Sequence, residues 1–76
     1  SIYPNPTREF FKMQLPPDVK PQLIEVYGIQ GQMVMRQTTL LVVDSLEINV
    51  SELNAGIYMV RVLAGNKVYV ARLLKQ

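Results

Sequence analysis

Residues 53–74 read LNAGIYMVRVLAGNKVYVARLL, with two apolar runs on either side of Gly65-Asn66. Gly and Asn between strand-like runs are typical of a β-hairpin with a two-residue turn. Side chains alternate along a strand, so this turn predicts two sets of facing pairs: Val62–Tyr69, Val60–Ala71 and Tyr58–Leu73 on one side, and Leu63–Val68, Arg61–Val70, Met59–Arg72 and Ile57–Leu74 on the other. Both arginines lie on the second side, so we expect the first side to face the core.

The start of the same stretch, LNAGIY, has the LxxGxY spacing of a tyrosine corner. In Greek-key sandwiches such a segment crosses between two sheets, and the tyrosine hydroxyl bonds to a backbone group of the loop. Gly56 would supply a backbone conformation that a Cβ atom disfavours. We therefore expect Leu53, Gly56 and Tyr58 to form this corner. The alternative is that Tyr58 is simply a half-buried aromatic residue of a strand.

The rest of the chain alternates in the same way between short strands and turns. Residues 1–7 form an extended segment, in which Pro4 and Pro6 flank Asn5, while Ile2 and Tyr3 pair briefly at a sheet edge. Strand-like segments follow at 9–15, 22–27, 32–37, 38–43 and 46–50, with turns at 16–18 and 28–31. We expect an all-β sandwich with Greek-key connections, and a small closed barrel is the alternative.

The alternation also predicts which side chains of these strands are buried. We expect the following residues to point inward: Phe11, Met13, Leu15, Ile24, Val26, Leu46, Ile48 and Val50. Glu25 and Glu47 are expected to point to water. In the strand 32–37, Val34 and Arg36 should share one face, and Met33 and Met35 the other.

Composition excludes several classes of function. The chain has 76 residues, no Cys and no His, and a net charge of +2. One domain, residues 1–76, is expected at this length, and the start without Met suggests a piece of a longer protein. No disulfide, thiolate metal site or histidine-based triad is possible, and the scattered basic residues do not favour nucleic acid.

Catalytic candidates are equally scarce. The serines at 1, 45 and 51 have no histidine to activate them, and the segment GIQG at 28–31 lacks the lysine of a phosphate loop. Asp44, Glu47 and Glu52 are neighbours in sequence, but Glu47 is expected to be a solubilising charge. We predict no catalytic, cofactor-binding or metal-binding residues, and hence no enzyme.

The outer side of the hairpin is unusually apolar for a solvent face. It carries Ile57, Met59, Leu63, Val68, Val70 and Leu74, interrupted by Arg61 and Arg72. Either another strand of the chain covers it, or it meets a partner, such as a second copy in a homodimer. The last strand is expected to be a sheet edge protected by Lys67, Arg72 and Lys75.

Several separated motifs together resemble one known family. They are YPNPT at 3–7 (Tyr3, Pro4, Asn5, Pro6), Gly31 followed by Val34, IxVSxL at 48–53, LxxGxYxVxV at 53–62 and RLLK at 72–75. The chain is similar to the C-terminal sorting domains of proteins exported by the type IX (Por) secretion system. Members often have Asp where this chain has Gly28, which leaves the geometry of the turn open.

This resemblance implies a fold and a function. The fold would be an immunoglobulin-like Greek-key β-sandwich of about seven short antiparallel strands. The domain would be a secretion signal that carries an attached N-terminal cargo through the periplasm and outer membrane. A sortase-type peptidase would then remove it, leaving the cargo secreted or anchored at the cell surface.

The outer-membrane machinery would recognise the hairpin and its tail, for which the candidates are Arg72, Leu73, Leu74 and Lys75. Addition of a partner strand at the sheet edge would provide affinity. The alternative function is an accessory module that binds carbohydrate or packs on a catalytic domain. That function would require a platform of exposed aromatic residues.

Overall fold

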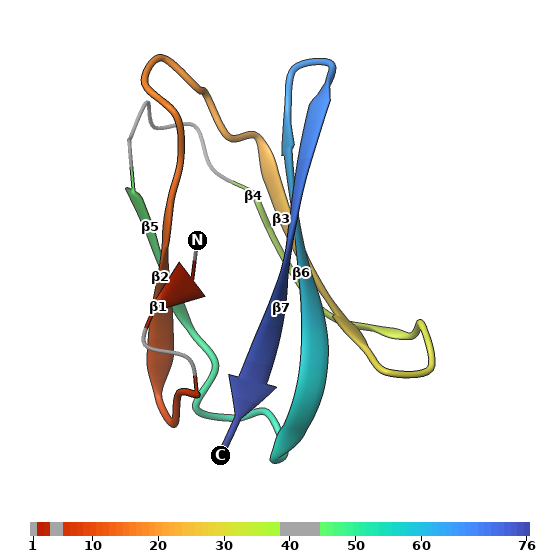
Figure 1. Cartoon of the computed structure of the whole chain (residues 1–76). Helices are drawn as coiled ribbons and strands as arrows, with labels where there is room; N and C mark the ends of the chain where they lie inside the picture. Colours follow the sequence, from red (N-terminus) through yellow and green to blue (C-terminus); the bar gives the residue numbers. More distant parts are fainter. Residues whose placement is uncertain (1, 4–5, 39–44) are drawn as a thin grey trace.

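The computed structural model describes residues 2–3, 6–38 and 45–76. This part of the chain contains no helix and forms two antiparallel sheets (Figure 1). The strands are β1 (Ile2–Tyr3), β2 (Phe10–Gln14), β3 (Leu23–Gly28), β4 (Met33–Thr38), β5 (Ser45–Asn49), β6 (Gly56–Ala64) and β7 (Lys67–Lys75). The all-β prediction is confirmed. Of the strand predicted at 38–43, Thr38 ends β4, and the remainder lies outside the described residues.

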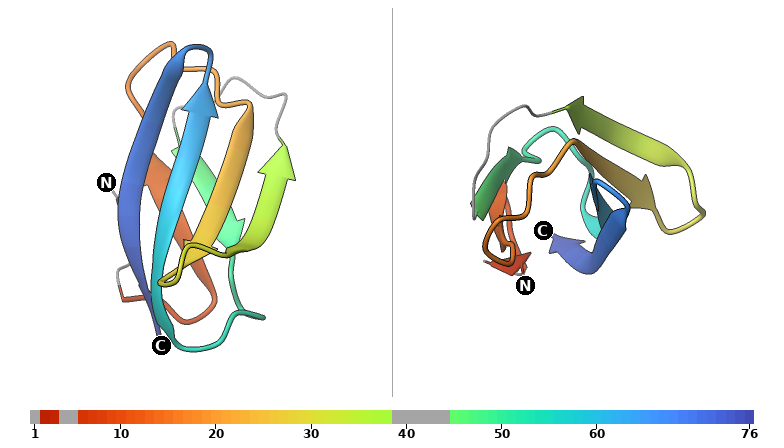
Figure 2. Two further views of the ribbon diagram at one scale, coloured as in Figure 1. Left: turned by 90° about the vertical axis from the view of Figure 1, so that its right-hand side faces the viewer. Right: turned by 90° about the horizontal axis from the view of Figure 1, so that it is seen from above.

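The two sheets face each other and enclose the core. One has the order β1-β2-β5 and the other the order β4-β3-β6-β7 (Figure 2). Among the side chains that the structure describes, ten apolar ones are buried between the sheets: Phe11, Met13, Leu15, Ile24, Val26, Ile48, Val50, Val60, Val62 and Leu73. Full burial of such a side chain stabilises the fold by about 1.5–3 kcal/mol. Seven of these residues are ones that the alternation predicts to point inward: Phe11, Met13, Leu15, Ile24, Val26, Ile48 and Val50. The side chain of Leu46, predicted to point inward as well, lies outside the described part of the structure.

The β6–β7 hairpin has the predicted register. Val62 pairs with Tyr69, Val60 with Ala71 and Tyr58 with Leu73, while the two arginines lie on the opposite face. Gly65 has a φ of 63°, the left-handed conformation that glycine adopts without steric cost. A positive φ at the first turn residue alone is the pattern of a type II′ turn, which matches the twist of the two strands.

The predicted faces of β4 are wrong at Met33. The register between β3 and β4 shifts between Val26 and Tyr27, so that Val26 pairs with Met35 but Tyr27 pairs with Met33. A β-bulge inserts one unpaired residue into a strand, so Met33 and Met35, which alternation alone would place on the same face, lie on opposite faces. Met35 therefore packs against the core with Val26, whereas Met33 lies on the outer face beside Tyr27.

Leu73 and Leu74 provide a matched test of this packing, because they are adjacent and chemically identical. Leu73 is fully buried, whereas Leu74 is 42% exposed. Leu73→Ala should lower the free energy of unfolding by about 2–5 kcal/mol, since it leaves a cavity in the core. Leu74→Ala should lower it by less than about 1 kcal/mol. Urea unfolding followed by circular dichroism measures both, and equal losses would contradict this packing.

Candidate recognition surface

The tyrosine corner before the hairpin is present. Tyr58 is half-buried, and its hydroxyl donates a hydrogen bond to the backbone carbonyl of Asn54 at 2.6 Å. Gly56 has a φ of 156°, which residues with a Cβ rarely adopt, and Leu53 packs against the core. The loop before the corner is held by Asn49, whose Oδ1 accepts hydrogen bonds from the Ser51 backbone N and Oγ. The predicted corner is confirmed.

The four tail residues proposed for recognition do not form one cluster. They alternate between the two faces of β7, so Leu73 is in the core and Lys75 is only 7% exposed. The ammonium group of Lys75 donates a hydrogen bond to the carbonyl oxygen of Gln76 at 3.2 Å. Arg72 and Leu74 lie on the outer face, paired with Met59 and Ile57 of β6. The folded domain therefore exposes Arg72 and Leu74 on its outer face, while Leu73 and Lys75 are largely covered.

The tail is fastened to the N-terminal part of the chain at Thr7, which is 3% exposed. Thr7 and Lys75 form a parallel β-bridge. The backbone N–H of Thr7 donates to the carbonyl of Leu74 at 2.9 Å, and the N–H of Gln76 donates to the carbonyl of Thr7 at 2.8 Å. The Thr7 hydroxyl also donates to the carbonyl of Phe10. We call this set of contacts the Thr7 clasp.

No pattern in the sequence indicates a separate role for Thr7. The residue stands at the end of the motif YPNPT, whose Pro residues indicated only an extended chain. Tyr3 pairs with Lys12 of β2, as expected for a short strand at a sheet edge. Pro4 and Asn5 lie outside the described residues, and Pro6 is exposed. The extended N-terminal segment therefore contacts both sheets, at β2 and at the end of β7.

The turn after β3 forms without the aspartate that is frequent in the family that the sequence resembles. The Gly28 N–H donates to the Gln32 carbonyl at 2.8 Å, and the Gly31 N–H donates to the Gly28 carbonyl at 3.0 Å. A Cβ atom at Gly28 would lie 2.4 Å from Nε2 of Gln32. The Gln32 side chain thus occupies the space beside Gly28, and backbone hydrogen bonds close the turn.

Large apolar side chains gather on the outer face of the four-stranded sheet. Six of the nine that are exposed among the described residues lie there: Met33, Ile57, Met59, Val68, Val70 and Leu74. No other described strand lies over this face (Figure 2), and β7 is one edge of the sheet. The apolar side of the hairpin was expected either to be covered by another strand or to meet a partner. Within the described part of the chain, no strand covers it.

Glu25 is buried, which corrects the prediction that it points to water. It lies on the outer face of the central strand β3, yet its side chain is only 10% exposed. Its Oε1 is 3.6 Å from Nη1 of Arg61 and accepts no hydrogen bond within the described structure. Arg36 and Arg61 are its cross-strand neighbours on either side. Their long side chains reduce access of water to a residue in the middle of a sheet.

A buried acceptor without a hydrogen bond destabilises a fold by about 1–3 kcal/mol. The only sequence feature that points to the burial of Glu25 is its position as a single charge within the apolar run LIEVY at 23–27. Glu47, in the three-stranded sheet, is by contrast exposed as predicted, and its Oε2 lies 3.9 Å from Nζ of Lys12, its cross-strand partner on β2. The two glutamates differ because β3 has strands on both sides, whereas β5 is a sheet edge.

The described residues bring together no group of three or more Asp, Glu, His or Cys side chains that could hold a metal ion. A hollow of about 390 Å³ lies between the β4 bulge and the corner loop, lined by Val34, Met35 and residues 49–53. In the same parts of the chain, no helix has the length and apolarity needed to cross a membrane. The outer sheet face and the β7 edge remain as the main candidate for a functional site.

The fold defines a small all-β module, and the outer sheet face and the β7 edge are its candidate binding surface. A comparison with protein families matches residues 1–76 to the family described as the secretion system C-terminal sorting domain, so the chain belongs to that family. The family provides the C-terminal sorting signal of the type IX (Por) secretion system, which exports proteins across the outer membrane. A comparison with curated proteins found no significant match.

Tyr58→Phe tests the corner. The variant loses the hydrogen bond to Asn54 but keeps the ring, so the free energy of unfolding should fall by about 0.5–1.5 kcal/mol. Tyr69→Phe is the control, because Tyr69 is also half-buried and makes no hydroxyl hydrogen bond within the described residues. Chemical denaturation measures both variants. Equal effects would show that the Tyr58 hydroxyl does not stabilise the loop.

Thr7→Pro tests the clasp. Proline has no N–H, so the bond to the Leu74 carbonyl is lost and the end of β7 should open more often. Amide hydrogen exchange at Gln76 should become about fivefold to tenfold faster, corresponding to about 1 kcal/mol for one hydrogen bond. Thr7→Ser keeps both the N–H and a hydroxyl and should exchange at nearly the wild-type rate. Unchanged exchange in Thr7→Pro would contradict the clasp.

Proposed function

We propose that this chain is a non-catalytic sorting signal that directs an attached N-terminal cargo across the outer membrane through the type IX system. The family match over residues 1–76 carries this proposal. The absence of Cys and His from the sequence supports a role without catalysis. After translocation, a sortase-type peptidase removes the domain, and the cargo is released or anchored at the cell surface.

The outer-membrane machinery recognises the hairpin and its tail. Strand β7 is an edge of its sheet, and a partner strand can add through backbone hydrogen bonds to the part of this edge that precedes the Thr7 clasp. Arg72 and Leu74 are the tail residues that the outer face presents, so they contact the partner first. Leu73 and Lys75 contribute indirectly, because their burial holds the end of β7 in place.

The sheet order supports an immunoglobulin-like Greek-key topology in one domain. Strands that follow each other in the chain lie in different sheets at β2–β3, β4–β5 and β5–β6. Such crossings are typical of Greek-key sandwiches, and the tyrosine corner lies at the last of them. The alternative function, a carbohydrate-binding accessory module, is less well supported. Among the described aromatic side chains, only Phe10 is exposed, and the others are half-buried or buried.

A reporter fusion tests the proposal in a host that has this secretion system. The fusion consists of a signal peptide, a fluorescent protein, a linker and the full chain, in that order. We expect reporter in the medium or on the cell surface with the chain present, and in the periplasm without it. Periplasmic reporter in both cases would refute the sorting function.

The tail requires point variants, because removal of residues 73–76 would also delete a core side chain and the Thr7 clasp. Arg72→Gln and Leu74→Ser change the tail residues on the outer face and should lower export. Arg8→Gln, at an exposed position in the loop before β2, is the control. Equal export by all three would argue against recognition through the tail.

A further inference from the structure

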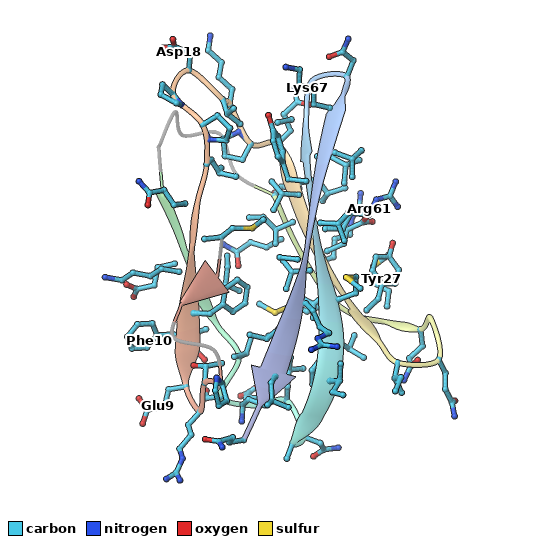
Figure 3. The ribbon with its side chains drawn as sticks, viewed as in Figure 1. Glu9, Phe10, Asp18, Tyr27, Arg61 and Lys67 are labelled. Atoms are coloured by element: carbon cyan, nitrogen blue, oxygen red, sulfur yellow. The ribbon has the colours of Figure 1, made fainter. Side chains whose placement is uncertain are left out.

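The outer face of the four-stranded sheet differs from that of the three-stranded sheet. On the first, apolar side chains such as Met59, Val68 and Val70 are 42–57% exposed. On the second, an exposed ion pair joins Lys12 and Glu47. Figure 3 shows Tyr27 and Arg61 projecting from the first face, and Phe10 from the opposite side of the molecule. An apolar surface restricted to one sheet is typical of a binding site.

This apolar face carries a net positive charge. Its described residues include Arg36, Arg61 and Arg72 but one acid, Glu25. Glu25 lies between Arg36 and Arg61 in a row across the sheet. Its side chain is nine-tenths buried, and Oε1 has no hydrogen-bond donor. The arginines favour a partner with carboxylates, and a donor from the partner can satisfy Glu25.

The position of the N-terminal segment leaves this face accessible in a fusion. Strand β1 pairs with β2 in the three-stranded sheet (Figure 2), so a cargo joined to the chain before β1 would be attached on that side. A cargo attached there does not need to pass over Met59 or Arg61. The four-stranded sheet can therefore contact a partner while the cargo is still attached.

From these observations we propose that the outer face of the four-stranded sheet docks on an apolar, net acidic protein surface of the translocation machinery. This inference rests on the proposed sorting function and identifies the surface and its partner's chemistry. Apolar contacts around Met59 and Val70 provide burial, and Arg36 and Arg61 pair with partner carboxylates. A second copy of the chain fits less well, because two faces with an excess of arginine would repel each other.

Two matched double variants test the proposal in the reporter fusion. Met59→Gln with Arg36→Gln changes the apolar, basic face. Phe10→Gln with Lys12→Gln makes the same kind of change on the other sheet, where Phe10 is 38% exposed compared with 42% for Met59. Because truncation of a central interface residue typically weakens binding by tenfold or more, we expect the first variant to reduce export about tenfold. The second should export like the wild type.

Stability and charge need their own controls. Urea unfolding of both double variants measures whether their stabilities are equal. Val70→Thr keeps the shape and strand preference of the side chain, so it is a milder change at an exposed position. Val70→Thr should also reduce export. Arg36→Glu should reduce export more than Arg36→Gln, since an acidic partner would be repelled.

The outcomes separate this inference from the sorting function. The docking face is supported if the wild type and the Phe10/Lys12 variant are exported normally, while the Met59/Arg36 variant and Val70→Thr lose export. Normal export of Met59/Arg36 overturns it while leaving the sorting function intact. Wild-type reporter held in the periplasm overturns both. Sedimentation showing a wild-type dimer that Met59/Arg36 dissociates would assign the face to a second copy instead.

Discussion

Gly65, in a left-handed conformation, closes the β6–β7 hairpin with two turn residues, and this turn fixes the partner of every residue from Lys67 to Lys75. Since side chains alternate, the turn also decides which half of β7 enters the core. A shift of one residue would bury Arg72 and expose Leu73. The core, the composition of the outer face and the position of the tail all depend on this register.

The last strand is also held at its far end. Hydrogen bonds between Thr7 and residues 74 and 76 join the two terminal regions of the described chain. The terminal residues of an edge strand are otherwise prone to fraying. The clasp thus couples the order of the end of β7 to that of the N-terminal segment.

The core and the exposed outer surface are formed by alternate residues of the same strands. On β6 and β7, the inner residues Val60, Val62 and Leu73 stabilise the sandwich, and the outer residues Met59, Val70 and Arg72 determine the surface. Substitutions on one side can therefore change one property with limited effect on the other. Glu25 is an exception, because burial on the outer face makes it part of both the stability and the surface charge.

The sequence by itself determined the features that arise from short-range pattern: the hairpin register, the tyrosine corner and the buried faces of β2, β3 and β5. In each case, residues a few positions apart carry the information, through turn chemistry and the two-residue period of a strand. Only the tertiary structure decided the bulge beside Met33, the burial of Glu25 and Lys75, and the Thr7 clasp. These depend on which strands become neighbours and which become edges, and residues far apart in the chain settle that order.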